Sequence, residues 1–341
     1  MKIVILGSPQ AGQQELFSLL ANIPLDTIRQ KPMEAQPGVC TVRDPRVTKL
    51  IQMYKPEKTA YAKIEFDLLP DFGMQGNTKT LIFNELKNSD EICWITKYDG
   101  AEADVPNFIS ELVIYDLMLV EKRLETIAKE QKKKFADAKE KEAALMSMCK
   151  DQLDAGKPLR ELSFTDEQLK EMRPYQFFTL KPTVLVINVP EDRINDASIT
   201  KKIREEFKYP CIQLNAELEE QINELKPEER GEFMKELGID EPAIDKITRL
   251  VYEGLGYISF FTVGTDEVKA WTTRRNSTAP EAGSSIHSDI QRGFVRAEMM
   301  KYADLISLGS ELKVKEAGKF HLKGKDYIVE DGDILSFLFN V

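Results

Sequence analysis

The sequence predicts an α/β fold: a doubly wound sheet, an inserted antiparallel helical hairpin and a smaller β-rich module at the C-terminal end. Three observations support this prediction. Apolar strands and amphipathic helices alternate over residues 1–100, as in sheets joined by crossover helices. Apolar residues spaced by four and three, typical of a coiled-coil seam, follow within 106–155. From residue 257 onward, short alternating segments are separated by glycines.

The first strand and the turn after it are the most informative elements. The apolar run 3–6 leads into G-S-P-Q-A-G-Q-Q at 7–14, and an amphipathic helix follows. Gly7 and Gly12 have the spacing of the phosphate-binding loop G-x-x-x-x-G-K-[ST]. Gln13 replaces the lysine that reaches the phosphates, and Gln14 replaces the hydroxyl that holds magnesium. The two glycines mark either a weakened anion site at a helix N-terminus or only a tight strand-to-helix turn.

These two replacements predict a large loss of activity. Catalysis in such loops comes almost entirely from positioning and from stabilisation of charge. One preorganised donor in a dry site lowers the barrier by roughly 3–4 kcal/mol. Without the lysine and the metal ligand, hydrolysis of a nucleoside triphosphate is therefore expected to fall by several orders of magnitude.

The next elements lead to a second departure from a nucleotide switch. A proline-rich stretch at 23–38 is predicted to be irregular, and a strand at 39–42 and a helix from Pro45 follow it. A core strand at 61–69 then ends in D-L-L-P-D-F-G. Nucleotide switches carry D-x-x-G here, but Pro70 has no N–H to offer a phosphate. Asp67 and Asp71 are interpreted as turn acids, with metal binding as the alternative.

After a helix at 78–86 and a strand at 92–96, the hairpin begins. Its apolar positions predict two long antiparallel helices with a turn near 131–137. A run of lysines would sit at the tip of the hairpin, either as a solvated helix end or as a contact with RNA. These residues are Lys132, Lys133 and Lys134.

The chain then returns to the sheet. T-D-E-Q at 165–168 is a capping box that opens a short helix, and a buried strand at 182–188 follows. Asn188 and Glu191 come at the carboxyl end of this strand, where doubly wound sheets bind ligands. They either read a base or cap the strand end. A strand at 211–215 and helices through residue 252 complete the domain.

The C-terminal module is predicted from strands at 258–263 and 267–272, glycine turns further on, and one helix near 295–303. Acidic residues there are about as numerous as basic ones, so an RNA-binding face requires that they segregate in space. The candidate RNA contacts are Arg274, Arg275, Arg292 and Arg296.

Composition narrows the class of partner. The net charge of −10 argues against broad binding to nucleic acid, and no DNA partner is expected. No apolar run approaches the roughly 20 residues that span a bilayer, and the N-terminus lacks a secretory pattern. We therefore expect a cytoplasmic protein without a membrane partner. The four cysteines lie far apart and the two histidines lack ligand partners, so neither a disulfide framework nor a metal site is predicted.

The C-terminal module closely resembles the TGS domain of the YchF/Obg-like ATPases. The residues that carry this resemblance are S-D-I-Q-R-G-F-V-R-A-E at 288–298, K-E-A-G-K at 315–319 and G-K-D-Y-I-V-E-D-G-D at 324–333. Upstream, N-x-x-E at 188–191 is similar to the family's base-reading segment, which goes with a preference for ATP. The family's loop reads G-x-P-N-V-G-K-S, and this chain keeps Gly7, Pro9 and Gly12 of it.

The resemblance implies a P-loop NTPase-like (Ras/Obg-like) domain with a C-terminal β-grasp-like TGS domain. The implied boundaries are 1–105 with 160–256 for the α/β domain, 106–159 for the inserted coiled coil and 257–341 for the TGS domain. The family's association with translation implies the ribosome or RNA as a partner.

Three functions remain open at this point. The first is a ribosome- or RNA-linked binding or regulatory protein that has lost hydrolysis. The second is an ATP- or GTP-binding protein with slow turnover, in which Lys2, Arg43 or Arg46 replaces the missing cation. The third is a sensor of anions or small ligands without turnover. ATP or GTP is thus the candidate cofactor, and the loss of the loop hydroxyl argues against magnesium.

Overall fold

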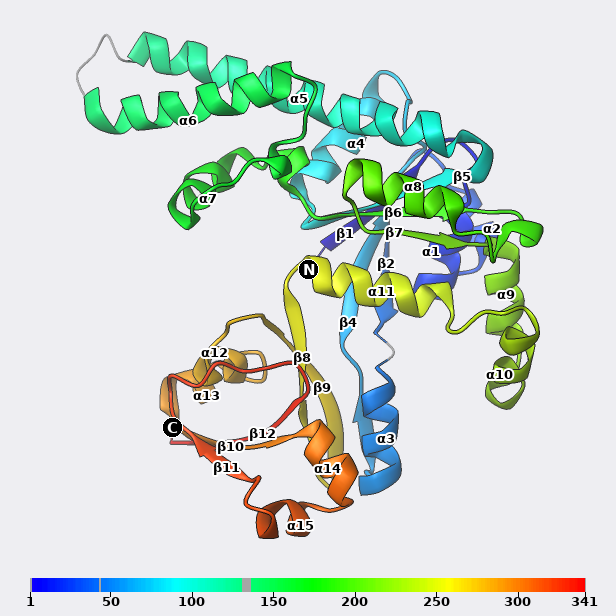
Figure 1. Ribbon diagram of the computed structural model, residues 1–341, viewed down its shortest axis with the longest axis vertical. Helices are drawn as coiled ribbons and strands as arrows, with labels where there is room; N and C mark the ends of the chain where they lie inside the picture. The colour runs from blue at the N-terminus through cyan, green and yellow to red at the C-terminus, as the bar shows by residue number, and fades with distance from the viewer. Residues whose placement is uncertain (1, 43, 131–135, 341) are drawn as a thin grey trace. The chain divides into compact units, whose positions relative to one another are not determined.

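The computed structural model describes residues 2–42, 44–130 and 136–340, without the side chains of 136–138, 227 and 228 (Figure 1). The chain forms two compact units. The first consists of Met1–Gly38 and Glu65–Ile244, and the second of Val39–Ile64 and Asp245–Val341. Within the described residues, no helix is both long enough and apolar enough to cross a bilayer.

The first sheet is doubly wound around its central strand β1. Neighbouring strands are parallel from β4 to β7. After β1 the chain builds one side of the sheet and then returns to build the other, so the topology switches between β1 and β5. In spatial order the strands are β2 (Gln36–Thr41), β4 (Lys63–Leu68), β1 (Lys2–Gly7), β5 (Glu91–Lys97), β6 (Thr183–Asn188) and β7 (Cys211–Leu214).

The predicted hairpin is present as α5 and α6, and α6 packs beside the C-terminal part of the longer helix α5 (Figure 1). Its predicted turn and the three lysines of its tip lie outside the described residues. The helices of the first unit are α1 (Gln13–Ala21), α2 (Leu25–Arg29), α4 (Asn77–Asn88), α5 (Ala101–Glu130), α6 (Ala136–Asp154), α7 (Asp166–Met172), α8 (Ser198–Phe207), α9 (Ala216–Glu224) and α10 (Pro227–Glu236). The next helix, α11 (Ala243–Gly254), begins at the end of the first unit and lies mostly in the second.

The base of the hairpin is fixed to the sheet by aromatic packing and by one buried acid. Trp94 of β5 stacks on Phe108 of α5 with their ring centroids 4.0 Å apart. The carboxylate of Asp116 accepts hydrogen bonds from the backbone N–H groups of Phe178 and Thr179 at 2.9 and 2.8 Å. Moving the segment before β6 away from α5 would leave the buried Asp116 carboxylate without these donors, which is costly in free energy. The two hydrogen bonds therefore hold the segment against α5.

The second unit contains a mixed sheet with small helices around it. Its strands in spatial order are β11 (His321–Lys323), β10 (Phe294–Lys301), β12 (Asp333–Phe339), β8 (Tyr257–Thr262), β9 (Glu267–Arg274) and β3 (Lys58–Ala60). Its helices are α3 (Pro45–Tyr54), α12 (Ala279–Ser284), α13 (Ser288–Gly293), α14 (Tyr302–Leu308) and α15 (Glu311–Glu316).

Two local predictions are wrong. The segment near 295–303 is not a helix but the strand β10, with α14 beginning only at Tyr302. It pairs with β12 on one side and β11 on the other, and this pairing decides its conformation. The stretch 23–38 is not irregular throughout, because α2 follows Pro24 and buries Ile28 completely.

The segment at 45–60, which contains α3 and β3, folds with the C-terminal part of the chain. Val47 and Leu50 of α3 are fully buried in the same core as Phe261. The guanidinium of Arg46 lies 5.0 Å from the ring centroid of Phe261 and pairs with Asp331 at 2.6 Å. Since β3 also pairs with β9, this segment is an integral part of the second unit.

Candidate functional site

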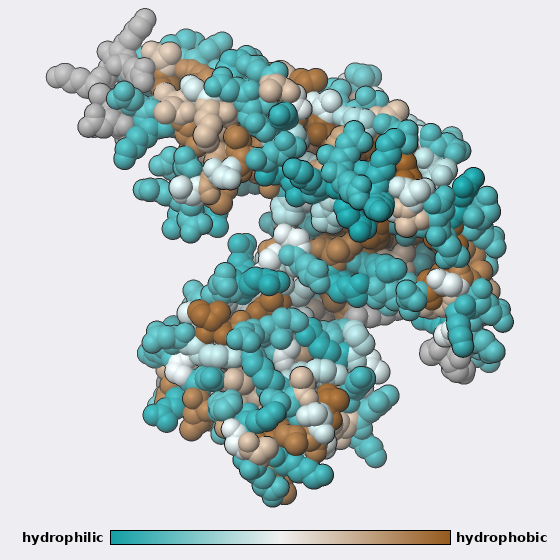
Figure 2. Space-filling model, viewed as in Figure 1, coloured by the Kyte–Doolittle hydropathy of each residue, from teal (hydrophilic) through white to brown (hydrophobic). Residues whose placement is uncertain are grey.

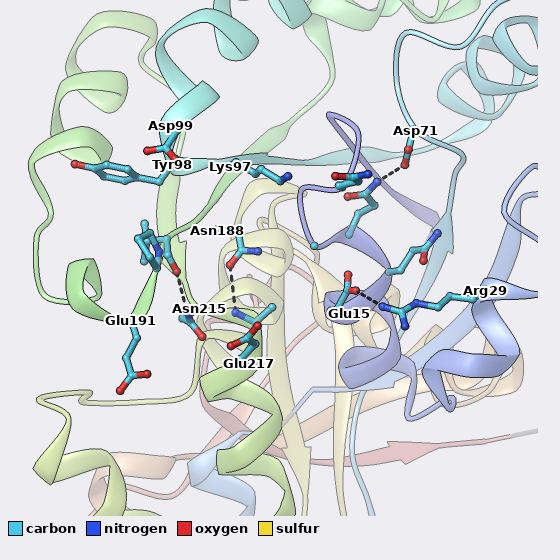
Figure 3. A pocket seen from close by; sticks show the side chains of 17 residues that line it. Glu15, Arg29, Asp71, Lys97, Tyr98, Asp99, Asn188, Glu191, Asn215 and Glu217 are labelled. Atoms are coloured by element: carbon cyan, nitrogen blue, oxygen red, sulfur yellow. Dashed lines mark hydrogen bonds and ion pairs between the residues drawn. The ribbon is translucent and has the colours of Figure 1, made fainter.

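A cavity of about 740 Å³ opens at the carboxyl ends of β1, β5 and β6 (Figure 3). This is where a doubly wound sheet forms a ligand crevice, because the loops on either side of the switch point separate there. We call the part of its wall around Gly12, Gln13 and Asp71 the phosphate side. The part around Asn188, Glu191 and Ala216 is called the base side.

The turn on the phosphate side depends on its two glycines. Gly7 ends β1 beside β5, where a Cβ would lie 2.3 Å from the carbonyl oxygen of Ile95. Gly12 precedes α1 with φ 101°, a left-handed conformation that L-residues with a Cβ adopt only with strain. A Cβ on Gly12 would also lie 2.5 Å from the side-chain nitrogen of Asn188. The predicted strand-to-helix turn is therefore present, whatever its ligand.

Gln13, at the position of the missing lysine, is turned into the protein. Its side chain is 2% exposed, and Nε2 donates a hydrogen bond to Oδ1 of Asp71. Oε1 of Gln13 has no hydrogen-bond partner among the described residues. Burial raises the pKa of Asp71, and the hydrogen bond from Gln13 partly offsets this rise. Gln14 also lines the cavity, whereas Pro9 is exposed and does not.

Of the three switch-like residues at the end of β4 and after it, only one lines the cavity. Asp67 lies within β4 and pairs with Lys2 at 2.7 Å, so it takes no part in the lining. Pro70 is buried, and only Asp71 reaches the cavity. Its contact with Gln13 joins the loop after β4 to the phosphate loop, a link that was not predicted from the sequence.

On the base side, Asn188 connects two loops. Its Nδ2 donates to the carbonyl oxygen of Ala11 at 3.0 Å, and its Oδ1 accepts from the N–H of Ala216 at 3.2 Å. Asn188 therefore joins the phosphate loop to the start of α9 even without a ligand. Glu191 lies in the lining with an exposed side chain, at the start of the 3₁₀ turn Glu191–Arg193. Asn215 caps α9 by accepting from the N–H of Leu218 at 2.8 Å.

The charged lining is mainly acidic. Its cationic side chains within the described residues are Arg29 and Lys97, and Arg29 is paired with Glu15 at 2.9 Å. Lys97 has no ion-pair partner in the described part of the chain, and it points into the cavity beside Asn188 (Figure 3). The acidic side chains of the lining are Glu15, Asp71, Asp99, Glu191 and Glu217.

The substitute cations suggested by the sequence do not reach this cavity. Lys2 lies at the opposite end of β1, where Asp67 and Glu85 hold it at 2.7 Å and raise its pKa. Arg46 belongs to the second unit, and Arg43 is outside the described residues. Lys97 is not among the site residues predicted from the sequence. It directly follows the strand predicted at 92–96, whose carboxyl end must lie next to that of β1 in a parallel sheet.

The residues present do not fit the magnesium site of a phosphate loop. Gln14 has no hydroxyl, and an amide oxygen is the only ligand that it could offer. Among the residues described, no three His, Cys, Asp or Glu side chains are grouped so as to hold a metal ion.

The candidate RNA contacts are spread over the second unit. Arg274 and Arg275 are exposed at the end of β9. Arg296 is exposed on β10, which is separated from β9 by the two strands β12 and β8. Arg292 of α13 pairs with Asp289, which neutralises part of its charge. The structure thus does not bring the four arginines into one row. The face drawn in Figure 2 is mainly hydrophilic, with scattered apolar patches.

Comparisons with known proteins cover the whole chain. The family model YchF-GTPase_C, described as a protein of unknown function (DUF933), matches residues 257–340. The ribosome-binding ATPase YchF of Bacillus subtilis is 34% identical over 99% of this chain and 98% of its own length. This chain belongs to the YchF family. The ribosome-binding ATPase YchF of Escherichia coli O157:H7 is 33% identical over 100% of this chain and 99% of its own length.

The fold agrees with a solved YchF structure. The Schizosaccharomyces pombe YchF GTPase superposes with a TM-score of 0.84 at 26% identity, covering 99% of this chain and 97% of that one. The YchF-like architecture predicted from the sequence, with its α/β sheet, helical insert and C-terminal β domain, is therefore confirmed.

Proposed function

We propose that this YchF-family chain is a binding or regulatory protein linked to the ribosome or to RNA, and that it has lost efficient hydrolysis of nucleoside triphosphates. The observation that carries the proposal is the state of residue 13. In a working loop this position holds a lysine that meets the phosphates. Here it holds a buried amide that is bonded to the carboxylate of Asp71.

The electrostatics of the cavity support the loss of hydrolysis. A triphosphate brings several negative charges, and catalysis requires cations where further charge develops. The wall instead carries more carboxylates than cations, and one of its cations is already paired with Glu15. A working nucleotide switch senses the last phosphate with the loop lysine and with the N–H of a glycine after the strand equivalent to β4. In this chain both are absent, since Gln13 and Pro70 stand at these positions.

The partner is inferred from the relatives. Proteins matched over their whole length are named as ribosome-binding, and a cytoplasmic location suits such a partner. The exposed arginines of the second unit and the predicted lysine tip of the hairpin are the contacts that we propose for the ribosome or RNA. With the α/β unit as a scaffold, this interaction needs no nucleotide.

A second function, ATP or GTP binding with slow hydrolysis, is favoured by one specific observation. Lys97 points into an open cavity beside the loop, where its ammonium group could meet a phosphate (Figure 3). The N–H groups at the start of α1 would add a weak attraction for anions. A sensor that binds an anion or small ligand without turnover would use the same groups.

Calorimetry with ATP, ADP and GTP, with and without magnesium, separates these functions. We expect no binding heat at about millimolar nucleotide, together with co-sedimentation with ribosomes that is unaffected by nucleotide. Micromolar binding that Glu191→Gln weakens would contradict the proposal and support a live base site. Glu191 is the better probe because Asn188 also holds two loops together.

A further inference from the structure

The loop after β4 is attached to β1 by two backbone hydrogen bonds. The N–H of Leu69 donates to the carbonyl oxygen of Ile5 at 2.8 Å, and that of Phe72 donates to Gly7 at 2.9 Å. The first continues the strand pairing, whereas the second lies beyond Pro70 and fixes the loop itself. The Phe72 amide therefore reports whether this loop is docked.

The ring of Phe72 supplies the second attachment. It contacts Trp94 edge-on at 5.1 Å between centroids and Phe108 at 5.4 Å. Such aromatic pairs contribute beyond the area that they bury. Gly73 and Gly76 follow with positive φ values, and nothing lies within 4 Å of the position of a Cβ on either. The loop is thus packed at Phe72 and again at Met74, which is partly buried against the same core, while the two glycines are exposed.

The third attachment is the contact between Gln13 and Asp71. A carboxylate only accepts hydrogen bonds, so Nε2 of Gln13 must face Asp71 and Oε1 must face away. Gln13 is part of the cavity wall, but it is only 2% exposed, so its side chain is almost fully enclosed. The phosphate loop and the loop after β4 are therefore joined directly by two side chains.

In nucleotide switches the last phosphate makes this connection, and the loop is released when that phosphate is lost. We propose that the Gln13–Asp71 pair is a built-in latch that keeps the loop at 70–76 docked without any ligand. The inference deepens the proposed function and rests on it. The docked loop conformation that a nucleotide switch holds only while the last phosphate is bound is, in this chain, held permanently.

Hydrogen exchange of the Phe72 amide in the full-length protein tests the latch. We expect the same protection with no nucleotide, with ADP and with ATP plus magnesium. Gln13→Leu and Asp71→Ala should each speed exchange about tenfold, since each removes a hydrogen bond to a charged group. The double variant should exchange no faster than either single variant, because both lose the same contact. Gln13→Lys, which keeps a donor, should retain the protection.

Two results would overturn the latch. One is wild-type protection of Phe72 in both single variants, which would mean that the ring alone holds the loop. The other is a clear increase in wild-type protection when nucleotide is added. Unchanged exchange of the β5 amides serves as the control for folding. Measured turnover with unchanged protection of Phe72 would refute the proposed function alone, so the two failures are distinguishable.

Discussion

On the phosphate side of the cavity Gln13 and Asp71 bond to each other, whereas on the base side Asn188 bonds to the backbone of two separate loops. A side chain that serves only the ligand can be replaced when the ligand is lost. One that also builds the site cannot be replaced without a cost in stability. This difference explains why Asn188 fits the family pattern although residue 13 does not. Because Asn188 also holds two loops together, its presence says little about whether the chain binds a nucleotide.

The largest expected effect comes from breaking the base side. Asn188→Ala removes two hydrogen bonds and leaves the N–H of Ala216 without its acceptor. The free energy of unfolding should fall by about 2–3 kcal/mol in the absence of any nucleotide. Urea unfolding measures this change. A loss below about 0.5 kcal/mol would mean that Asn188 serves only a ligand.

A smaller effect is expected where the two sides touch. Gly12→Ala should cost about 2 kcal/mol of stability, since φ is 101° and the new Cβ would meet Nδ2 of Asn188 at 2.5 Å. In an Asn188→Ala background the clash disappears, and the cost should drop to about 1 kcal/mol. Additive effects in this double-mutant cycle would show that Gly12 and Asn188 do not interact.

The pH dependence of stability isolates the phosphate side. Burial raises the pKa of Asp71, so the folded chain keeps a proton that the unfolded chain has already released. This group therefore stabilises the fold most at low pH, and its contribution falls as the pH rises past the ordinary aspartate pKa. Asp71→Asn should remove this component of the pH dependence, which begins above the ordinary aspartate pKa of about 4. Denaturation profiles of identical slope for the two proteins would refute this assignment.

The smallest effect is expected for Lys97. Its side chain is exposed and has no ion-pair partner among the described residues, so Lys97→Ala should change stability by no more than about 0.5 kcal/mol. The variant is thus a matched control for Asn188→Ala at the same edge of the sheet. A loss of stability comparable to that of Asn188→Ala would show that any substitution at this edge of the sheet destabilises the fold. The structural role assigned to Asn188 would then not be specific to that residue.

Local patterns were enough to predict much of the molecule. The strand at 183–188, the capping box at Thr165 and the turn between Gly7 and Gly12 each depend on neighbouring residues, and the structure contains all three. The acid–amide pair of Gln13 and Asp71 joins residues 58 positions apart, and no local pattern encodes it.

The features that were not predicted correctly also depend on contacts between residues far apart in the sequence. The helix predicted near 295–303 is the strand β10, because its conformation is decided by pairing with β11 and β12, which local sequence does not reveal. The attachment of α3 to the second unit depends on burial against Phe261, which is more than 200 residues away. Lys97 could have been found, since parallel strands place their carboxyl ends at one edge of the sheet.

The most direct test of the central claim is a turnover assay with the full-length chain, ATP and magnesium. We expect no release of phosphate above a protein-free control, because neither Gln13 nor Gln14 can supply the ammonium group and the hydroxyl that the loop has lost. Lys97→Ala identifies the source of any activity, since a contaminating enzyme would be unaffected by it. Magnesium-dependent release that disappears in Lys97→Ala would contradict the proposed loss of hydrolysis and show that this lysine replaces the missing cation.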